Sequence, residues 1–424
     1  MEGFYTLNAP TNNYILFGCA GINSALLLNY CLWFVGASTI AAWLCIPLVV
    51  FGFLYLSFCV FRQKLSLWPI PVFFLVLLLI SLSTAAVAWD ARSIWLFHAK
   101  RIFLDENLFA QLDNYAPWSH NDYPVIIPAF SASIANLAGY WNEILPKTAN
   151  IAFLVVPMFL IGVVLQNTVS IIFFIITAIY MCSHYLHDGF VDANIAFMVT
   201  SLVLISFKFD DLGRKSQNIV IYIVATSLSI LVLMKNEGVL LFGIYCGLLY
   251  VYNIYGKFIN SARLFCLGVL PLFFFSSWKS YCFMYGIKNE LTSSDMLAQV
   301  FGRVFNLNDI KLIVSYLLYQ EWAVIFAIIL GITFFNLKYI RKLNVIFAVF
   351  FACIYALCLI FVYLLTPHNL SWHLSASASR VIMPLNMLSV SVLLYIVNAA
   401  FFDRFIASLN LRNNYINASE TRKP

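Results

Sequence analysis

The stretch WDARSIWLFHAKRIFLDENLFAQLDNYAPWSHNDYPVIIP, residues 89–128, is a charged and aromatic interruption in a run of apolar segments. The segments on either side have the length and composition of membrane spans, which need about 20 largely apolar residues. Charged side chains are unfavourable in the hydrocarbon layer, so this stretch belongs at a membrane surface or in a polar cavity. The sequence therefore predicts a bundle of spans organised around one large loop, and we expect the chemistry to be there.

Composition places the whole chain in the membrane class. Hydrophobic residues make up 63% of the 424 residues and charged residues only 10%, and the mean hydropathy is +0.90. Soluble domains have about 25% charged residues. The N-terminus has neither a basic region nor a small-residue cleavage site, so no removable signal peptide is expected. The ten cysteines fall almost entirely in apolar runs without metal-ligand spacing, which indicates small buried hydrophobes.

Hydropathy predicts an all-α, polytopic transmembrane helical bundle of about 12–13 helices. Ten spans are clear, and a zone between residues 124 and 186 contains three further apolar stretches, 124–140, 148–165 and 168–186. The ten clear spans are 14–35, 38–61, 67–88, 191–207, 217–234, 238–255, 264–285, 321–336, 344–365 and 381–402.

Short loops rich in Lys and Arg mark the cytoplasmic side of a membrane. One arrangement puts both termini and 14 of the 24 basic residues on that side, against five of the 18 acidic residues. The basic residues are Arg62, Lys64, Lys208, Arg214, Lys215, Lys257, Arg263, Lys338, Arg341, Lys342, Arg404, Arg412, Arg422 and Lys423. The arrangement requires an even number of crossings between Asp122 and His187. We therefore expect 124–140, the most polar of the three stretches, to be re-entrant or interfacial.

With this topology the unusual polar residues lie together on the outer face. They are residues 89–123, 187–192, 235–238, 285–321 and 366–380, and all six histidines are at or near them. Lys235 and Glu237 stand between two spans with almost no loop, so they need a polar cavity or each other. A second interpretation remains open, in which they form a tight interfacial hairpin with the lysine reaching to the surface.

A roughly amphipathic segment follows Asp90. One side carries Trp95, Ala99, Ile102 and Phe103, and the other side carries Lys100 and Arg101. This pattern predicts a helix lying in the membrane interface. Under the alternative interpretation Arg92, Lys100 and Arg101 are only its solvated face.

The sequence contains no P-loop, no dinucleotide-binding glycine fingerprint and no GxSxG elbow. A reaction at the outer face needs a substrate that is already activated and delivered through the bilayer. A sugar linked to a lipid phosphate meets this requirement. A carboxylate would take a proton from the acceptor hydroxyl, and Lys or Arg would stabilise the leaving phosphate.

The order of motifs carries a resemblance to a known family. Trp89-Asp90-Ala91 ends a span, His120-Asn121-Asp122-Tyr123-Pro124 opens the next apolar stretch, and Asp188/Asp192 and Lys235-Asn236-Glu237-Gly238 follow. This order resembles the catalytic module of GT-C-type integral membrane glycosyltransferases, in particular bacterial members of the protein mannosyltransferase and lipid A aminoarabinose transferase superfamily. The resemblance covers roughly residues 67–255. The segment Thr366–Arg380 is similar to a TP…WH…S..R stretch of uncharacterised bacterial members.

The chain also departs from the family pattern. Many relatives have two adjacent acidic residues in the first loop, whereas Asp90 is followed by Ala91 and Arg92. Asp122-Tyr123-Pro124 stands where the family commonly has Lys-Pro-Pro, so the phosphate-binding role of that lysine would pass to Arg92, Lys100 or Arg380.

The resemblance implies a set of roles. Asp90 is the expected catalytic base, and Lys235, Arg380 and, more weakly, Arg92 are expected to bind the donor phosphate. Sugar or acceptor binding is expected of His120, Asp122, Tyr123, Asp192, Glu237 and His373. Metal dependence is left open, with Mg or Mn as the divalent cation that His120, Asp122, Asp192 and His373 could hold.

The resulting interpretation is a bacterial inner-membrane glycosyltransferase with its site facing the periplasm or exterior. Its partners are a polyprenyl-phosphate-linked sugar, a glycan or lipid-linked acceptor and membrane lipids, and no nucleic acid. Residues 1–66 are expected to be two anchor spans, 67–255 the catalytic module, and 256–424 further helices with outer loops 286–320 and 366–380. A transporter or flippase and an O-antigen polymerase or ligase are the alternatives.

Overall fold

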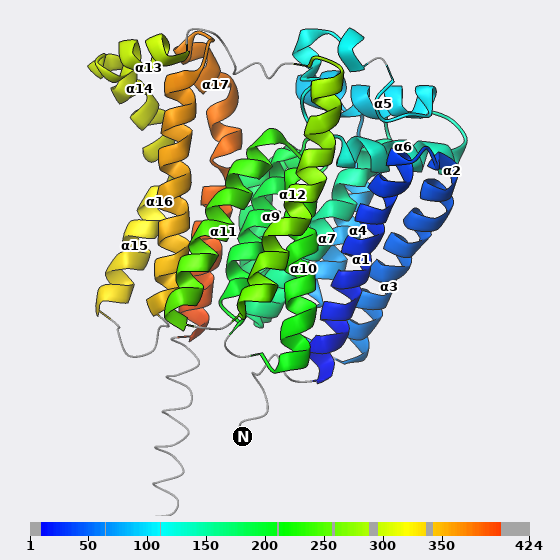
Figure 1. The fold of residues 1–424 in the computed structure, drawn as a ribbon. Helices are drawn as coiled ribbons and strands as arrows, with labels where there is room; N and C mark the ends of the chain where they lie inside the picture. Colours follow the sequence, from blue (N-terminus) through cyan, green and yellow to red (C-terminus); the bar gives the residue numbers. More distant parts are fainter. Residues whose placement is uncertain are drawn as a thin grey trace, which may run out of the picture.

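The structure is a computed structural model that describes residues 10–63, 65–110, 112–209, 212–256, 259–287, 296–335 and 342–399. Within these ranges the protein is all-α and has no strand (Figure 1). Nine of the described helices are long and apolar enough to cross a membrane, and a pair of helices bent by 69° makes a tenth span if the two are counted together. The predicted all-α membrane bundle is therefore confirmed, and the chain is an integral membrane protein.

Each of the twelve predicted spans corresponds to a helix or to a pair of joined helices. These are α1 (Pro10–Phe34), α2 (Ser38–Ile40) continuing through η1 (Ala41–Cys45) into α3 (Ile46–Arg62), α4 (Pro69–Ser83), α7 (Ala149–Leu165), α8 (Thr168–Cys182), α9 (Asp192–Ser206), α10 (Arg214–Val232), α11 (Asn236–Gly256), α12 (Ser261–Met284), α14 (Leu307–Leu318) with α15 (Glu321–Phe335), α16 (Lys342–Leu365), and α17 (Leu370–Val381) with the helical segment 383–399.

Two short helices lie at one end of the bundle, the upper end in Figure 1, which we call the site end. They are α5 (Leu96–Asp105), which follows the single π-helical turn η2 (Ala91–Trp95), and α6 (Ile126–Ala138). At 1.5 Å per residue the 13 residues of α6 reach only about 20 Å, less than the hydrocarbon layer. α6 lies at the site end, where α7 begins (Figure 1). That 124–140 is re-entrant or interfacial stays a prediction.

α5 is amphipathic as expected. Trp95, Ala99 and Ile102 are buried on its inner side, Lys100 is exposed, and Arg101 pairs with Asp105 one turn on at 2.7 Å. The predicted amphipathic helix is therefore present, and its apolar side packs on α6.

The span predicted at 67–88 is shorter in the structure. α4 ends at Ser83, and Thr84 is extended. The buried ammonium group of Lys147 donates hydrogen bonds to the carbonyl oxygen of Thr84 at 2.6 Å and to its hydroxyl at 3.1 Å. These bonds replace the helical partners of the last turn, so residues 84–88 can unwind toward Asp90.

The two expected late outer loops are largely helical. Residues 286–320 include α13 (Met296–Val304) and α14, while 288–295 lie outside the described residues. Residues 370–380 belong to α17, and together with 383–399 they make one 30-residue crossing from Leu370 to Ala399. The loop prediction was wrong there because the serines, histidine and arginine of 371–380 lower the local hydropathy without preventing a helix.

The first two spans are part of the core. Asn23 of α1 donates to the hydroxyls of Thr226 and Ser227 of α10, at 3.1 and 2.8 Å. Asn29 and Trp33 both donate to the Ser133 hydroxyl of α6 at 2.7 Å. Buried polar groups need such partners, so α1 is fixed in register against the helices that reach the site end.

The helix ends that carry predicted cytoplasmic basic residues lie together at the opposite end of the bundle. α3 ends there at Arg62, and α10, α12 and α16 begin there (Figure 1). Lys64, Lys257, Lys338, Arg341 and the basic residues of the tail lie outside the described residues.

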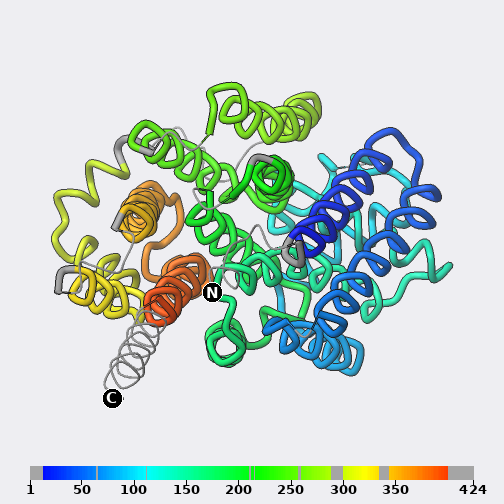
Figure 2. The backbone as a smooth tube through the Cα atoms, turned by 90° about the horizontal axis from the view of Figure 1, so that it is seen from below, coloured from blue at the N-terminus to red at the C-terminus, as the bar shows by residue number. Residues whose placement is uncertain are grey.

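Seen along the bundle from that end, helices from the two halves of the sequence form opposite flanks (Figure 2). The blue helices α1 and α3 lie on one flank, and the yellow to red helices α15 to α17 lie on the other. The green helices, α10 and α11 among them, lie between the flanks. A contact between the first loop and α17 therefore brings together residues far apart in the sequence.

Candidate functional site

Five ionisable side chains meet near the site end, and we call them the ion cluster: Asp90, Asp192, Lys235, Glu237 and Arg380. The Lys235 ammonium lies 2.9 Å from Asp192 Oδ1 and 3.7 Å from Glu237 Oε2. The Arg380 guanidinium donates to Asp90 Oδ2. These side chains are between 3% and 23% exposed, so the pairs are largely removed from solvent. The five residues come from four separate segments of the chain.

Local structure explains the position of each carboxylate. Asp90 follows the unwound end of α4 and immediately precedes the π-helical turn η2. Asp192 is the first residue of α9, where a negative charge interacts favourably with the helix dipole. Glu237 lies in the first turn of α11, directly after the turn that carries Lys235.

Gly238 allows the tight turn that holds Lys235 and Glu237. α10 ends at Val232 and α11 begins at Asn236, and the Gly238 amide donates to the Lys235 carbonyl at 2.8 Å. A Cβ at position 238 would collide with the backbone carbonyl of Leu231. The absence of a side chain therefore lets α11 start directly against the end of α10.

Arg380 stands at a break between α17 and the segment 383–399. Pro384 has no amide hydrogen, so it cannot donate to the carbonyl four residues earlier, that of Arg380. The regular helix stops at Val381, and Leu385 donates to the Ile382 carbonyl at 2.9 Å instead of one residue earlier. The break leaves Arg380 directed at Asp90.

Tyr355, in the middle of α16, joins the ion cluster to this break. Its hydroxyl contacts Glu237 Oε1 and lies 2.8 Å from the carbonyl oxygen of Val381. The side chain is fully buried. Sequence reasoning missed Tyr355, because it is one of 23 tyrosines and stands in an apolar span with no polar neighbour.

Aromatic rings of the first loop cover the cluster. The Lys235 ammonium lies 6.0 Å from the centre of the Tyr123 ring, at the limit of a cation–π contact. Tyr123 stacks on His120 at 4.6 Å and on Trp95 at 5.7 Å. Burial, and then the charge of Lys235, lower the pKa of His120 to about 4, so its imidazole is neutral near pH 7.

His120 has a backbone conformation that is rare for residues other than glycine. Its φ is +50°, in the left-handed region, at the end of the short helix η4 (Pro117–Ser119). Such strain is often found at functional sites, where the surrounding structure holds it. The conformation turns the chain so that His120 and Tyr123 lie face to face.

Asp122 belongs to a neighbouring polar group rather than to the ion cluster. Its carboxylate accepts a hydrogen bond from Asn236, and its carbonyl accepts one from Trp278 Nε1 at 3.0 Å. Lys279 donates to Asn236 Oδ1 at 3.0 Å. Burial raises the pKa of Asp122, although Lys279 and Asn236 oppose the rise. Asn236 therefore connects this group with Lys235, its neighbour in the chain.

The predicted site residues Arg92 and His373 also lie outside the ion cluster. Arg92 lies 3.8 Å from Glu143, and both side chains are about half exposed. His373 is bound through Nδ1 to the Thr366 hydroxyl at 2.7 Å and packs against Tyr363. Arg92 is only two residues from Asp90 in sequence, but the two side chains have different partners.

The predicted ligands of a divalent cation do not converge. Among the described residues no group of three or more His, Cys, Asp and Glu side chains could hold a metal ion. Asp192 binds Lys235, Asp122 binds Asn236 and His373 binds Thr366. The proposed set of His120, Asp122, Asp192 and His373 was therefore wrong as a common metal site.

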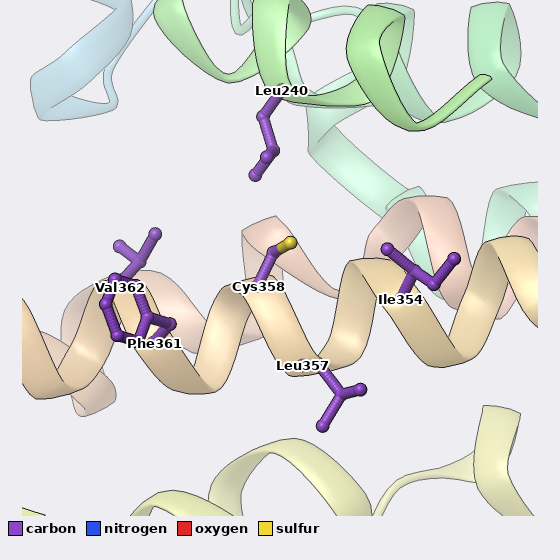
Figure 3. A pocket seen from close by; sticks show the side chains of 6 residues that line it. All are labelled: Leu240, Ile354, Leu357, Cys358, Phe361 and Val362. Atoms are coloured by element: carbon purple, nitrogen blue, oxygen red, sulfur yellow. The ribbon is translucent and has the colours of Figure 1, made fainter. Parts of the chain in front are cut away.

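An apolar pocket of about 300 Å³ opens between α11 and α16. Leu240 of α11 points toward Ile354 and Cys358 of α16, as Figure 3 shows. Leu240 follows Glu237 by three residues, and Ile354 precedes Tyr355, so the pocket adjoins the polar site. The complete lining is Leu240, Ile354, Leu357, Cys358, Phe361 and Val362.

Comparison of the chain with protein-family models, with curated proteins and with solved structures finds no match.

Proposed function

We propose that the protein is a membrane glycosyltransferase of GT-C type that transfers a sugar from a polyprenyl phosphate to a hydroxyl acceptor. One observation carries the proposal. Asp90, Asp192, Lys235 and Arg380, which are distant in sequence, form a buried cluster of ion pairs beside an apolar pocket. The anionic phosphate of a polyprenyl-phosphate donor would bind at the ion cluster, and its hydrocarbon chain would bind in the apolar pocket.

In the proposed reaction Asp90 is the base and Arg380 the phosphate ligand. The bond between the anomeric carbon and the phosphate oxygen breaks, and its electron pair leaves on the phosphate. A bond forms between the anomeric carbon and the acceptor oxygen, whose proton passes to Asp90. Arg380, now paired with Asp90, would turn to the phosphate and stabilise its charge together with Lys235.

The proposed orientation puts the cluster on the outer face of a bacterial inner membrane. It is supported by the basic residues at the helix ends of the opposite side of the bundle, which follow the positive-inside pattern. His120 and Tyr123, which cover Lys235, are proposed to contact the sugar or the acceptor.

Transfer of labelled sugar from polyprenyl phosphate by the purified protein tests the proposal. Asp90→Asn keeps the shape of the side chain but removes the base, so we expect turnover to fall at least about 100-fold. Arg92→Gln is the matched control, because Arg92 lies close in sequence but outside the cluster, and it should keep near-wild-type turnover. Near-wild-type turnover of a folded Asp90→Asn protein would remove Asp90 from the role of base.

A transporter is the second candidate, and charge balance is the observation that favours it. Both cations of the ion cluster are already paired with carboxylates. Paired charges inside a membrane protein also form proton and ion pathways. This candidate requires a sealed compartment for activity, whereas the transferase does not.

A further inference from the structure

The hydroxyl of Tyr355 lies close to two acceptor oxygens but has only one proton to donate. Its hydroxyl lies within hydrogen-bond distance of Glu237 Oε1 and of the Val381 carbonyl oxygen. A tyrosine hydroxyl donates one hydrogen bond, while a carbonyl oxygen and an ionised carboxylate only accept. One contact therefore needs a proton from the other partner. A carbonyl has none to give, but a carboxylic acid has one.

The Val381 carbonyl oxygen is the acceptor to which the Tyr355 hydroxyl donates its hydrogen bond. In an unbroken helix this carbonyl would accept from the amide of Leu385, but that amide donates to Ile382 at 2.9 Å. A buried carbonyl without a donor is unfavourable, and the Tyr355 hydroxyl is the donor that reaches it, at 2.8 Å. The satisfied arrangement is a chain in which Glu237 donates to Tyr355 and Tyr355 donates to Val381.

The charges around Glu237 agree with this arrangement. Lys235 is within hydrogen-bond distance of Asp192 at 2.9 Å, whereas its distance to Glu237 Oε2 is 3.7 Å. Arg380, from α17, is paired with Asp90. Tyr363 also faces Glu237, and its hydroxyl is 2.8 Å from the hydroxyl of Ser377.

An ionised Glu237 would give the ion cluster three carboxylates against two cations. An uncharged Glu237 leaves two carboxylates, Asp90 and Asp192, against Arg380 and Lys235. A buried charge without a counter-charge is strongly unfavourable, so the balanced state is favoured.

We propose that Glu237 is an uncharged carboxylic acid in the resting protein and holds a proton that the site can transfer. The proton is shared between α11 and α16 through Tyr355, at the junction of the ion cluster and the apolar pocket. The assignment concerns the resting protein and holds for a transferase and a transporter alike.

Infrared absorption of the full-length protein in lipid nanodiscs at neutral pH tests the assignment. The difference between wild type and Glu237→Gln should show loss of the carbonyl stretch of a protonated carboxylic acid, which shifts in D₂O. The Gln amide can donate to Tyr355 in place of the acid, so the variant retains the hydrogen-bond chain. Loss of carboxylate bands instead would overturn the proposal. Asp192→Asn is the control, and its difference spectrum should show loss of carboxylate bands.

A second measurement does not depend on the folding of the glutamine variant. Wild type at neutral pH should itself show a protonated-carboxyl band, and Tyr355→Phe should shift the frequency of that band, because Glu237 loses its hydrogen-bond acceptor. A wild-type spectrum without such a band, or a band that Tyr355→Phe leaves unchanged, would also overturn the proposal.

Discussion

At the scale of single residues, the ionisable side chains of the site are largely buried and pair with one another. Lys235 is flanked by Asp192 and Glu237. Burial alone would lower the pKa of Lys235, but the charge of the Asp192 carboxylate opposes burial, and the pKa is raised. Lys235 is therefore a permanent cation, and its buried partners depend on it.

Lys235→Met should destabilise the protein strongly. Removing one partner of a buried ion pair leaves the other charge uncompensated, which costs about 3–5 kcal/mol. The measurement is the thermal unfolding midpoint in detergent, where we expect a clear drop. Arg92→Met is the matched control, because exposed pairs such as Arg92–Glu143 contribute about 0–1 kcal/mol.

Neutralising Asp192 as well should recover part of the loss, since Lys235→Met/Asp192→Asn leaves no uncompensated carboxylate at this pair. Equal thermal unfolding midpoints for Lys235→Met and Arg92→Met would contradict the assignment of Lys235 and Asp192 as a buried ion pair.

Sequence reasoning found all five ionisable residues of the ion cluster but not the neutral partners that hold them. Asp90, Asp192, Lys235, Glu237 and Arg380 stand out because charges are rare in apolar chains. Tyr355 and Lys279 lie within predicted spans, and nothing in the sequence assigned them to the site. Asn236 was part of the Lys235–Gly238 motif, but no role was predicted for it. Whether such a side chain faces lipid or a site depends on helix rotation, which hydropathy does not specify.

At the scale of elements, breaks in helices place the site residues. α4 unwinds at Thr84, η2 is a π-helical turn after Asp90, and Pro384 interrupts the last crossing next to Arg380. Hydropathy predicted 67–88 as one span because it measures apolarity and not helical hydrogen bonding. The buried Lys147, which holds the unwound end of α4, is distant in sequence from Thr84 and could not be assigned to it.

Gly238→Ala should disrupt the turn between α10 and α11. The new methyl group would meet the Leu231 carbonyl, and α11 would have to move with Lys235 and Glu237. We expect a lower unfolding midpoint and loss of activity. Gly243→Ala, on the same helix, meets no atom within 4 Å and should be neutral or stabilise by up to about 1 kcal/mol. Equal effects of the two alanines would contradict the close approach at Gly238.

At the scale of the whole molecule, the all-α membrane bundle followed from hydropathy and length alone. The described residues contain nine helices long and apolar enough to cross a membrane, or ten spans if the bent pair counts as one, against about twelve predicted. Hydrogen bonds join α1, which belongs to the predicted N-terminal anchor, to helices of the predicted catalytic module. Asn23 and Asn29 bind α10 and α6 across the bundle. A polar residue inside a span shows that a partner is needed, but the sequence does not name the partner.

The most direct test of the central claim compares two preparations of the same protein supplied with labelled sugar on polyprenyl phosphate and a hydroxyl acceptor. One is in lipid nanodiscs, which enclose no compartment, and the other is in sealed proteoliposomes. The proposed transferase forms a new glycosidic bond in nanodiscs and loses this activity with Asp90→Asn. Movement of label into sealed vesicles, with no glycosidic product in either preparation, would contradict the account.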